Sequence, residues 1–198
     1  MRRAASGFTL VELLITVAVA MLVLGIALPP LLELAAGREV RLAAAEVGSA
    51  LRLARAHAVT HAVHVGVKFR TDAVGAVSWT LYRDGDGDGV RSDDILSGVD
   101  PRVAPARSLA HFGRQVRLGF PPGPAPRDPG DPRRRLDRLD DPIRFNRSDI
   151  ASFGPLGGST PGTVYVTDGR SRLAATRVTN ATARTRVLVY DPRRELWR

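Results

Sequence analysis

The stretch from Gly7 to Pro30, GFTLVELLITVAVAMLVLGIALPP, decides how this chain is organised. From Phe8 to Leu28 it runs for 21 residues with a single charged side chain, Glu12. At ~1.5 Å per residue, a helix of this length crosses the ~30 Å hydrocarbon core of a membrane. The sequence therefore predicts one transmembrane helix over residues 8–29.

A short basic segment, MRRAASG at residues 1–7, precedes the apolar run. Arg2 and Arg3 are expected to stay in the cytoplasm, which places the rest of the chain beyond the membrane. An ordinary secretory signal would carry its small residues after the apolar core, whereas Ala4, Ala5, Ser6 and Gly7 come before it. Residues 1–7 are therefore predicted to be a leader of a different kind.

GFTLVE followed by about twenty apolar residues resembles the prepilin motif of type IV pilins and type II secretion pseudopilins. The resemblance implies that a prepilin peptidase cleaves between Gly7 and Phe8 and that the Phe8 amine is methylated. It also implies that Glu12 guides entry into a filament, because an acid in a membrane helix needs a partner. The alternative is a plain signal anchor with a tolerated interfacial acid.

A second helical segment, the stem at residues 30–59, is predicted beyond the two prolines. Pro29 matches the proline that kinks the pilin stem, and Pro29–Pro30 is expected to kink or briefly melt the helix. Beyond Gly37 one apolar stripe recurs at helical spacing. Its members are Val40, Ala44, Val47, Leu51, Ala54 and Ala58. We expect this stripe to pack against a sheet.

Residues 60–198 are predicted to form one β-rich domain, so the fold class is α+β. Val63 to Phe69 alternates apolar and polar side chains, as does Val77 to Tyr82, which predicts a hairpin. Further strands are predicted at 115–120, 142–145, 163–167, 172–178 and 184–190. The stretch PPGPAPRDPGDP at 121–132 cannot hold a ladder and is expected to be a surface loop.

Three internal segments resemble the GspH/FimT group of minor pseudopilins: LRLARAHAVTHAVHVGV, IRFNRSDIASFGPLGG and TVYVT with TRVLVYD. The resemblance implies a structural subunit of a type II secretion or type IV pilus filament, with a pilin-like fold. Its partners would be other pilins, the prepilin peptidase and the inner-membrane assembly platform. The domain would lie in the periplasm, and the machine served stays open.

An acidic stretch, DGDGDGVRSDDI at residues 84–95, resembles the first half of an EF-hand calcium loop. Asp84, Asp86 and Asp88 alternate before Gly89, while the closing acids, Asp93 and Asp94, fall earlier than the twelfth position and no second helix is expected. Hard carboxylate oxygens on a bent loop suit calcium. The alternative is a solvated turn, because Asp-Gly pairs favour turns without any ion.

Basic residues are the competing signal, since the chain carries a formal net charge of +9 and only one of its 29 basic residues is lysine. Some FimT-type members bind DNA during uptake, and GRSR at 169–172 has the spacing of their Gly-Arg-x-Arg motif. Arg170 and Arg172 are therefore the candidate DNA contacts, in an uptake role that is the alternative to the structural one. A solvated arginine face, or a GC-rich genome, explains the charge equally simply.

Neither composition nor motifs indicate an enzyme. The chain has no cysteine, which excludes thiolate metal sites and cysteine nucleophiles. The four histidines lack an accompanying nucleophile motif, and no G-x-S-x-G elbow is present.

Overall fold

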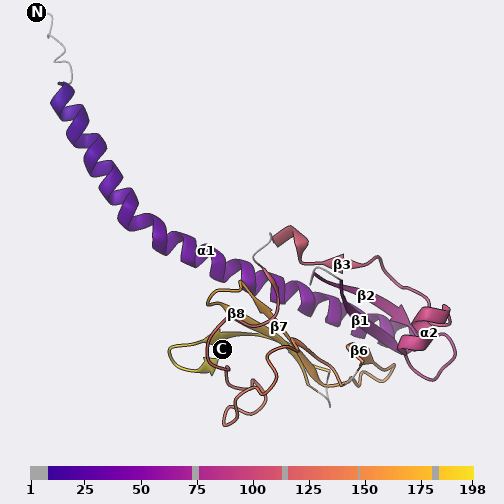
Figure 1. Ribbon diagram of the computed structural model, residues 1–198. Coiled ribbons are helices and arrows are strands. Elements are labelled where there is room, and N and C mark those ends of the chain that lie inside the picture. Colours follow the sequence, from indigo (N-terminus) through magenta and orange to yellow (C-terminus); the bar gives the residue numbers. More distant parts are fainter. Residues whose placement is uncertain (1–8, 73–75, 113–115, 147, 180–182) are drawn as a thin grey trace, which may run out of the picture. The chain divides into compact units, whose positions relative to one another are not determined.

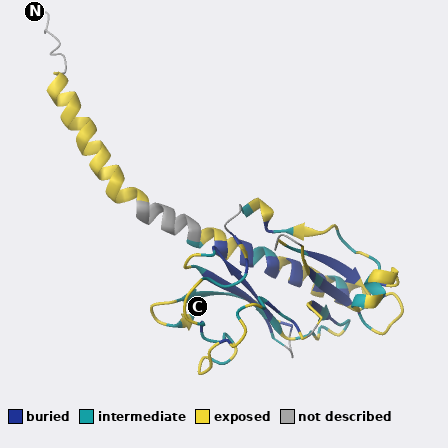
Figure 2. Ribbon diagram, in the orientation of Figure 1, coloured by how far each residue is buried: buried dark blue, intermediate teal, exposed yellow. Residues whose placement is uncertain are grey.

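The computed structural model describes residues 9–72, 76–112, 116–146, 148–179 and 183–198, with the backbone alone at residues 29–36 (Figure 1). Contacts divide the chain into two units, residues 1–37 and 38–198. The first unit holds the beginning of a long helix, α1 (Leu10–His61). Residues 10–28 of this helix are exposed along their whole length, as Figure 2 shows, so the chain itself provides no cover for them.

The two prolines do not interrupt α1, whose helical backbone runs from Leu10 through Pro29 and Pro30 to His61. Of the two expected effects, a kink or a melted segment, the melted segment is therefore wrong. The physical reason is that a proline removes one backbone N–H and crowds one preceding turn, while the bonds on either side remain available. Residues 10–28 and the stem at residues 30–59 thus belong to the same helical element.

The second unit contains two antiparallel sheets and the last turns of α1. One sheet has the order β3-β2-β1-β6 and the other β10-β9-β8-β7-β4, with β5 also paired to β7. The elements after α1 are β1 (Val65–Thr71), β2 (Val77–Arg83), α2 (Ser92–Ser97), β3 (Arg107–Ser108), a 3-10 turn (Ala110–Phe112), β4 (Arg117–Leu118), β5 (Ile143–Arg144), β6 (Ile150–Phe153), β7 (Gly162–Thr167), β8 (Leu173–Val178), β9 (Thr185–Asp191) and β10 (Leu196–Trp197). The predicted α+β class is confirmed.

The predicted apolar stripe of the stem is the centre of the main core. All six of its members are buried, and they pack with apolar side chains of both sheets. Figure 2 shows the stripe as the dark blue side of the helix. The Thr176 hydroxyl on β8 donates to the Ala44 carbonyl at 2.6 Å, which links the helix to the second sheet inside the core.

The hairpin predicted after the stem is confirmed, with Val67 paired to Leu81 and Phe69 to Trp79. The later predicted strands exist but differ in length by a few residues, and the prediction at Gln115 lies outside the described residues. The predictions missed β6, α2 and the two-residue strands β3 and β10. These elements are too short to show a period, so pairing with distant residues defines them.

The predicted surface loop at 121–132 has a structural role that composition did not show. Together with residues as far as Leu139 it covers the outer face of the second sheet, where Leu136 packs with Tyr165, Leu173 and Ala175. Both faces of β7 and β8 are therefore buried, which explains their continuous apolar character.

Candidate functional site

Helix α1 begins at a capping arrangement formed by TLVE, residues 9–12. The Glu12 backbone N–H donates to the Thr9 hydroxyl at 3.2 Å, and the Leu13 N–H donates to the Thr9 carbonyl at 3.1 Å. Threonine at the cap with glutamate three residues later is the pattern of a capping box. Glu12 therefore stands in the first helical turn, where the helix dipole favours a negative charge. The predicted cleavage residues, Gly7 and Phe8, lie outside the described residues.

One helix of the described chain, Leu10–Leu28, is long and apolar enough to cross a membrane. None of its side chains is buried against the rest of the chain, and large ones such as Leu10, Met21 and Ile26 are each more than two thirds exposed. Contact of this apolar surface with water would be unfavourable, whereas lipid or neighbouring apolar helices would cover the surface.

The acidic stretch forms a compact loop between β2 and α2. Asp84, Asp86 and Asp88 each offer a carboxylate oxygen within 4.8 Å of the others, while Asp86 and Asp88 are exposed and Asp84 is 7% exposed. Asp88 also pairs with Arg91. Oxygen atoms gathered on a bent loop are the ligand type that calcium takes.

Asp84 is held by the loop's own backbone. Its carboxylate accepts the N–H groups of Gly87 at 2.8 Å and Gly89 at 2.9 Å, and of Asp86 at 3.2 Å. Burial opposes the charge, but these donors outweigh it and lower the pKa of Asp84. The resulting stability is present above the pKa of an unfolded aspartate, ~3.9, and is lost as the pH falls through the lower folded value.

The pKa values of two other acids of the loop shift in the opposite direction. Removal from solvent, together with the charges of Asp86 and Asp94, raises the pKa of Asp88 even though Arg91 opposes the shift. Solvent removal and the neighbouring charges of Asp86 and Asp100 likewise raise the pKa of Asp94. The loop therefore contains more negative charge than its own cations neutralise.

The second half of the loop differs from the sequence prediction. A helix does follow it, because α2 begins at Ser92, and Asp93 and Asp94 stand in its first turn, where the helix dipole favours acids. They lie outside the group formed by the three alternating aspartates. Buried Asp100 closes the loop instead by accepting the N–H groups of Gly85 at 3.1 Å and Arg91 at 3.0 Å. Sequence reasoning missed Asp100 because it lies beyond the motif.

A small apolar cluster fixes the loop to the first sheet. Val90 packs with Tyr82 and Ile150, and it lies directly over Gly66 on β1. A Cβ at Gly66 would come within 2.7 Å of the Val90 side chain, so only glycine leaves room for this contact. The loop that carries the acidic carboxylates is therefore packed against the first sheet.

The candidate DNA contacts lie on the turn between β7 and β8. Buried Asp168 organises this turn by accepting the N–H groups of Arg170, Ser171 and Arg172 at 2.9 to 3.0 Å. Burial opposes the charge of Asp168, but these donors lower its pKa. Arg170 is exposed, Arg172 is half-buried, and Arg117 passes close to Gly169. The structure thus brings the two predicted arginines together on one turn.

Comparison with protein families gives two matches along the chain. Residues 2–28 match the prokaryotic N-terminal methylation motif, and residues 43–183, more than half of the chain, match the family described as type II transport protein GspH. The chain belongs to the GspH family. It is a GspH/FimT-like pseudopilin, a minor subunit of type II secretion or type IV pilus machinery. One apolar helix, Leu10–Leu28, anchors the chain in the membrane. Comparison with curated proteins and with solved structures returns no match.

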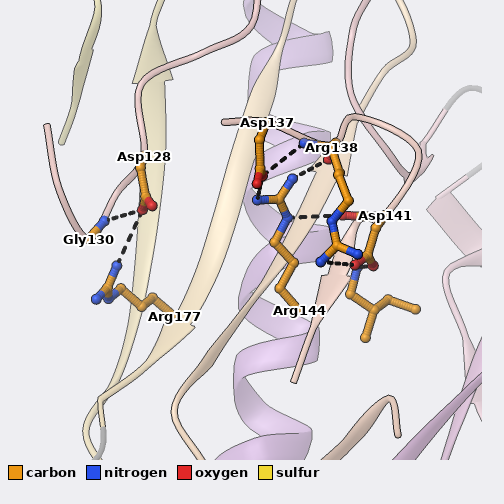
Figure 3. Close-up of polar contacts among 8 residues, drawn as sticks. Asp128, Gly130, Asp137, Arg138, Asp141, Arg144 and Arg177 are labelled. Atoms are coloured by element: carbon orange, nitrogen blue, oxygen red, sulfur yellow. Dashed lines mark hydrogen bonds and ion pairs between the residues drawn. The ribbon is translucent and has the colours of Figure 1, made fainter. Parts of the chain in front are cut away.

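The outer face of the pseudopilin's second sheet carries a set of arginines that belong to no sequence motif. Figure 3 shows Arg144 on β5 between Asp137 and Asp141, and Arg177 on β8 beside Asp128. The Arg144 guanidinium donates to Asp137 at 3.2 Å and to the Asp141 carbonyl at 3.1 Å. It also lies 5.6 Å from the centre of the Tyr165 ring. Hydrogen bonds to residues 137 and 141 and contact with an aromatic ring thus fix the Arg144 side chain.

Glu195 organises a second group on the same face of the pseudopilin. It accepts hydrogen bonds from Arg127 at 3.1 and 3.3 Å and also pairs with Arg135. The hydrogen bond from the Arg135 guanidinium lowers the pKa of Glu195, because its effect is larger than the opposing effect of removal from solvent. These residues are far apart in sequence, so only the folded segment at 120–142 brings them together.

The GspH pseudopilin family is structural rather than enzymatic. The histidines of this member form no catalytic pair with a nucleophile among the described residues. His57 and His61 stack at 4.0 Å on the last turns of α1, and His61 and His64 are exposed.

Proposed function

We propose that this chain is a minor pseudopilin that is processed by prepilin peptidase and assembled into a filament by the inner-membrane platform. Residues 1–7 are the leader, 8–29 the transmembrane part, 30–59 the stem and 60–198 the periplasmic domain. The observation that carries the proposal is the order of two matches in one chain, a methylation motif at residues 2–28 and then a GspH domain at residues 43–183. The exposed apolar helix supports it, because the core of a filament would cover that surface.

Deleting the gene in its native host tests the machine that the filament serves. If the pseudopilin belongs to a secretion filament, export of secreted proteins falls while DNA uptake is unchanged. If DNA uptake falls instead, the chain serves a pilus. Normal export, uptake and filament formation together would contradict the proposal.

The alternative role, DNA binding during uptake, is favoured by one observation, the exposed turn that carries Arg170 and Arg172 beside Arg117. Guanidinium contacts to phosphate weaken with salt, and each contact adds ~0.7 to 0.9 to the slope of log K against log salt. If the turn binds DNA, a mobility shift by the full chain in detergent weakens at the higher of two salt concentrations. Arg170→Gln/Arg172→Gln then lowers the salt slope by about 2.

The matched control for this experiment is Arg41→Gln/Arg55→Gln, which removes the same charge from the exposed side of the stem. If both double variants weaken the shift equally, general basicity explains the binding and the turn has no special role. If the wild-type chain gives no shift, the structural role stands alone.

We further propose that Asp84, Asp86 and Asp88 hold a calcium ion, with Asp93 or Asp94 and the Val90 carbonyl available to complete its shell. The support is the 4.8 Å grouping of three carboxylates on a loop packed against the sheet. Removal from solvent and, after it, the neighbouring carboxylates raise the pKa of Asp88 and of Asp94. A divalent cation would relieve this repulsion. Magnesium is expected to stabilise less because it demands a tighter octahedron.

Calcium is therefore expected to raise the melting temperature of the full chain, and a chelator to reverse the rise. At 100-fold saturation, binding to the folded state contributes ~2.7 kcal/mol, or about 5–10 °C for a domain of this size. Differential scanning calorimetry measures the shift. Asp86→Ala/Asp88→Ala is expected to respond to neither calcium nor chelator, whereas the control Asp131→Ala/Asp140→Ala keeps both responses. A wild-type melting temperature unchanged by calcium would leave the stretch as a solvated turn.

A further inference from the structure

Two arginines face each other across the second sheet. Arg177 on β8 is the direct register partner of Arg186 on β9, so both side chains project from the same face of the sheet. Like charges placed directly opposite each other destabilise a strand pair. An anion bound between the two guanidinium groups would offset this repulsion.

The neighbouring acids neutralise this arginine pair only in part. The nearest carboxylate to Arg177 is that of Asp128 at 3.8 Å, and Asp128 already accepts the Gly130 N–H at 2.6 Å (Figure 3). The side chain of Arg186 is exposed and makes no ion pair or hydrogen bond within the part of the chain that the structure describes. Glu195, the other carboxylate of this region, already holds Arg127 and Arg135.

A hollow of about 260 Å³ lies beside the two arginines. Its polar wall contains three arginines and one acid, and its apolar wall contains three large side chains: Arg127, Arg177, Arg186 and Glu195 on the first, and Leu188, Leu196 and Trp197 on the second. Trp197 is fixed there, because its indole N–H donates to the Arg127 carbonyl at 2.7 Å and its ring packs against Tyr190. The hollow thus combines guanidinium donors with an apolar surface, and it has room for a side chain.

We propose that this hollow binds a carboxylate side chain of an acidic polypeptide from another protein, held between Arg177 and Arg186 and flanked by apolar residues. Guanidinium groups bind carboxylates through two parallel hydrogen bonds, and Leu188, Leu196 and Trp197 would cover the aliphatic part of the bound segment. All residues that line the hollow belong to one chain, so the hollow exists without a neighbouring subunit. It lies at the opposite end of β8 from the turn with Arg170 and Arg172.

Charge and shape favour a polypeptide over a nucleic acid. Asp128, Asp137 and Glu195 are interspersed with the arginines of this face, so its positive charge is divided into separate spots and forms no continuous track for a phosphate backbone. A recessed hollow admits one discrete carboxylate, whereas nucleic acid presents a charge at every nucleotide along an extended track. Glu195 on the wall also opposes a doubly charged free phosphate more than a singly charged carboxylate.

Trp197 makes the proposal directly measurable. The chain has two tryptophans, and Trp79 is 1% exposed in the main core, so its emission is a constant background. The full chain in detergent is titrated with acetyl-Leu-Glu-Leu-Glu-Leu-amide and with the matched peptide that has glutamine in place of glutamate. The expected result is a saturable change in emission with the glutamate peptide alone. Equal responses to both peptides, or no saturable response, would overturn the proposal.

Two single variants with the same charge change locate the binding. Arg186→Gln is expected to weaken peptide binding by about tenfold or more, whereas Arg184→Gln, just before β9 and outside the hollow, binds as the wild type does. Without peptide, Arg186→Gln should melt at the wild-type temperature or above it, because it removes a like-charge pair. Unchanged binding by Arg186→Gln, or a large fall in its melting temperature, would overturn the assignment.

Two further titrations distinguish other anions. Inorganic phosphate and a single-stranded oligonucleotide are each added in place of the peptide, with Trp197 emission as the readout. Weak or absent responses support a polypeptide partner. If phosphate saturates the response as tightly as the peptide, the hollow is a free-anion site. If the oligonucleotide binds more tightly and Arg186→Gln abolishes its binding, the partner is a nucleic acid, and either result overturns the proposal.

Discussion

The full chain carrying Glu12→Ala or Glu12→Val is expected to insert into the membrane normally but to be absent from filaments. Insertion survives because either change makes the Leu10–Leu28 span more apolar. We expect assembly to fail because these variants lack the carboxylate, which we propose pairs in the filament with the Phe8 ammonium of a neighbouring subunit. Removing one member of a buried ion pair costs about 3–5 kcal/mol, since the other charge is left without a partner. Membrane fractionation and filament shearing, followed by immunoblotting, measure the two outcomes.

The capping contact at Thr9 suggests a competing explanation, in which Glu12 serves only to start the helix. Glu12→Gln separates the two, because it retains a capping side chain but removes the charge, and we expect it to fail in assembly. Thr9→Val removes the hydroxyl that caps the helix and leaves the charge, so it should assemble. Glu39→Ala, an exposed glutamate farther along α1, is the matched control and should also assemble. Filament incorporation of Glu12→Gln at the wild-type level would contradict the pairing.

The second large effect concerns the leader. The mature protein is expected to begin at Phe8, and Gly7→Val is expected to retain residues 1–7 in full, because a peptidase that cuts directly before the apolar run must admit a small residue at the bond. The uncut chain has no amine at Phe8, so it should also be absent from filaments. Mass spectrometry of the chain purified from its native host measures the N-terminus.

Ala5→Val is the control for this prediction, since it adds the same side-chain bulk to the leader away from the bond. It should be processed like the wild type. An intact leader on the wild-type chain would show that the resemblance at GFTLVE does not extend to processing. Complete processing of Gly7→Val would instead show that the peptidase reads another residue.

Much of the helical architecture could be predicted from local periodicity. All six stripe residues of the stem are buried, because a spacing of three and four places them on one side of any α-helix, whatever its partner. The first hairpin followed from alternation for the same reason, since Val67 and Leu81 project to one face of an extended pair. The apolar span could be recognised because its length alone matches a membrane.

The acidic loop was predicted only in part. The alternation of Asp84, Asp86 and Asp88 is local, and the structure does bring their oxygens together. Asp100 closes the loop from beyond the motif, and α2 begins where no helix was expected. The contact between Val90 and Gly66 depends on β1, which precedes the loop by many residues. A motif describes neighbours in sequence, and these contacts join residues that are neighbours only in space.

The sequence by itself determined the membrane helix, the buried side of the stem, the α+β class and the family, because each depends on composition or on a repeat within a few turns of chain. Only the tertiary structure decided that residues 120–142 cover the second sheet and that Glu195 joins Arg127 to Arg135. It alone placed Arg177 opposite Arg186. Strand register sets which side chains meet, and register is fixed by the whole core packing at once, so no local pattern contains it.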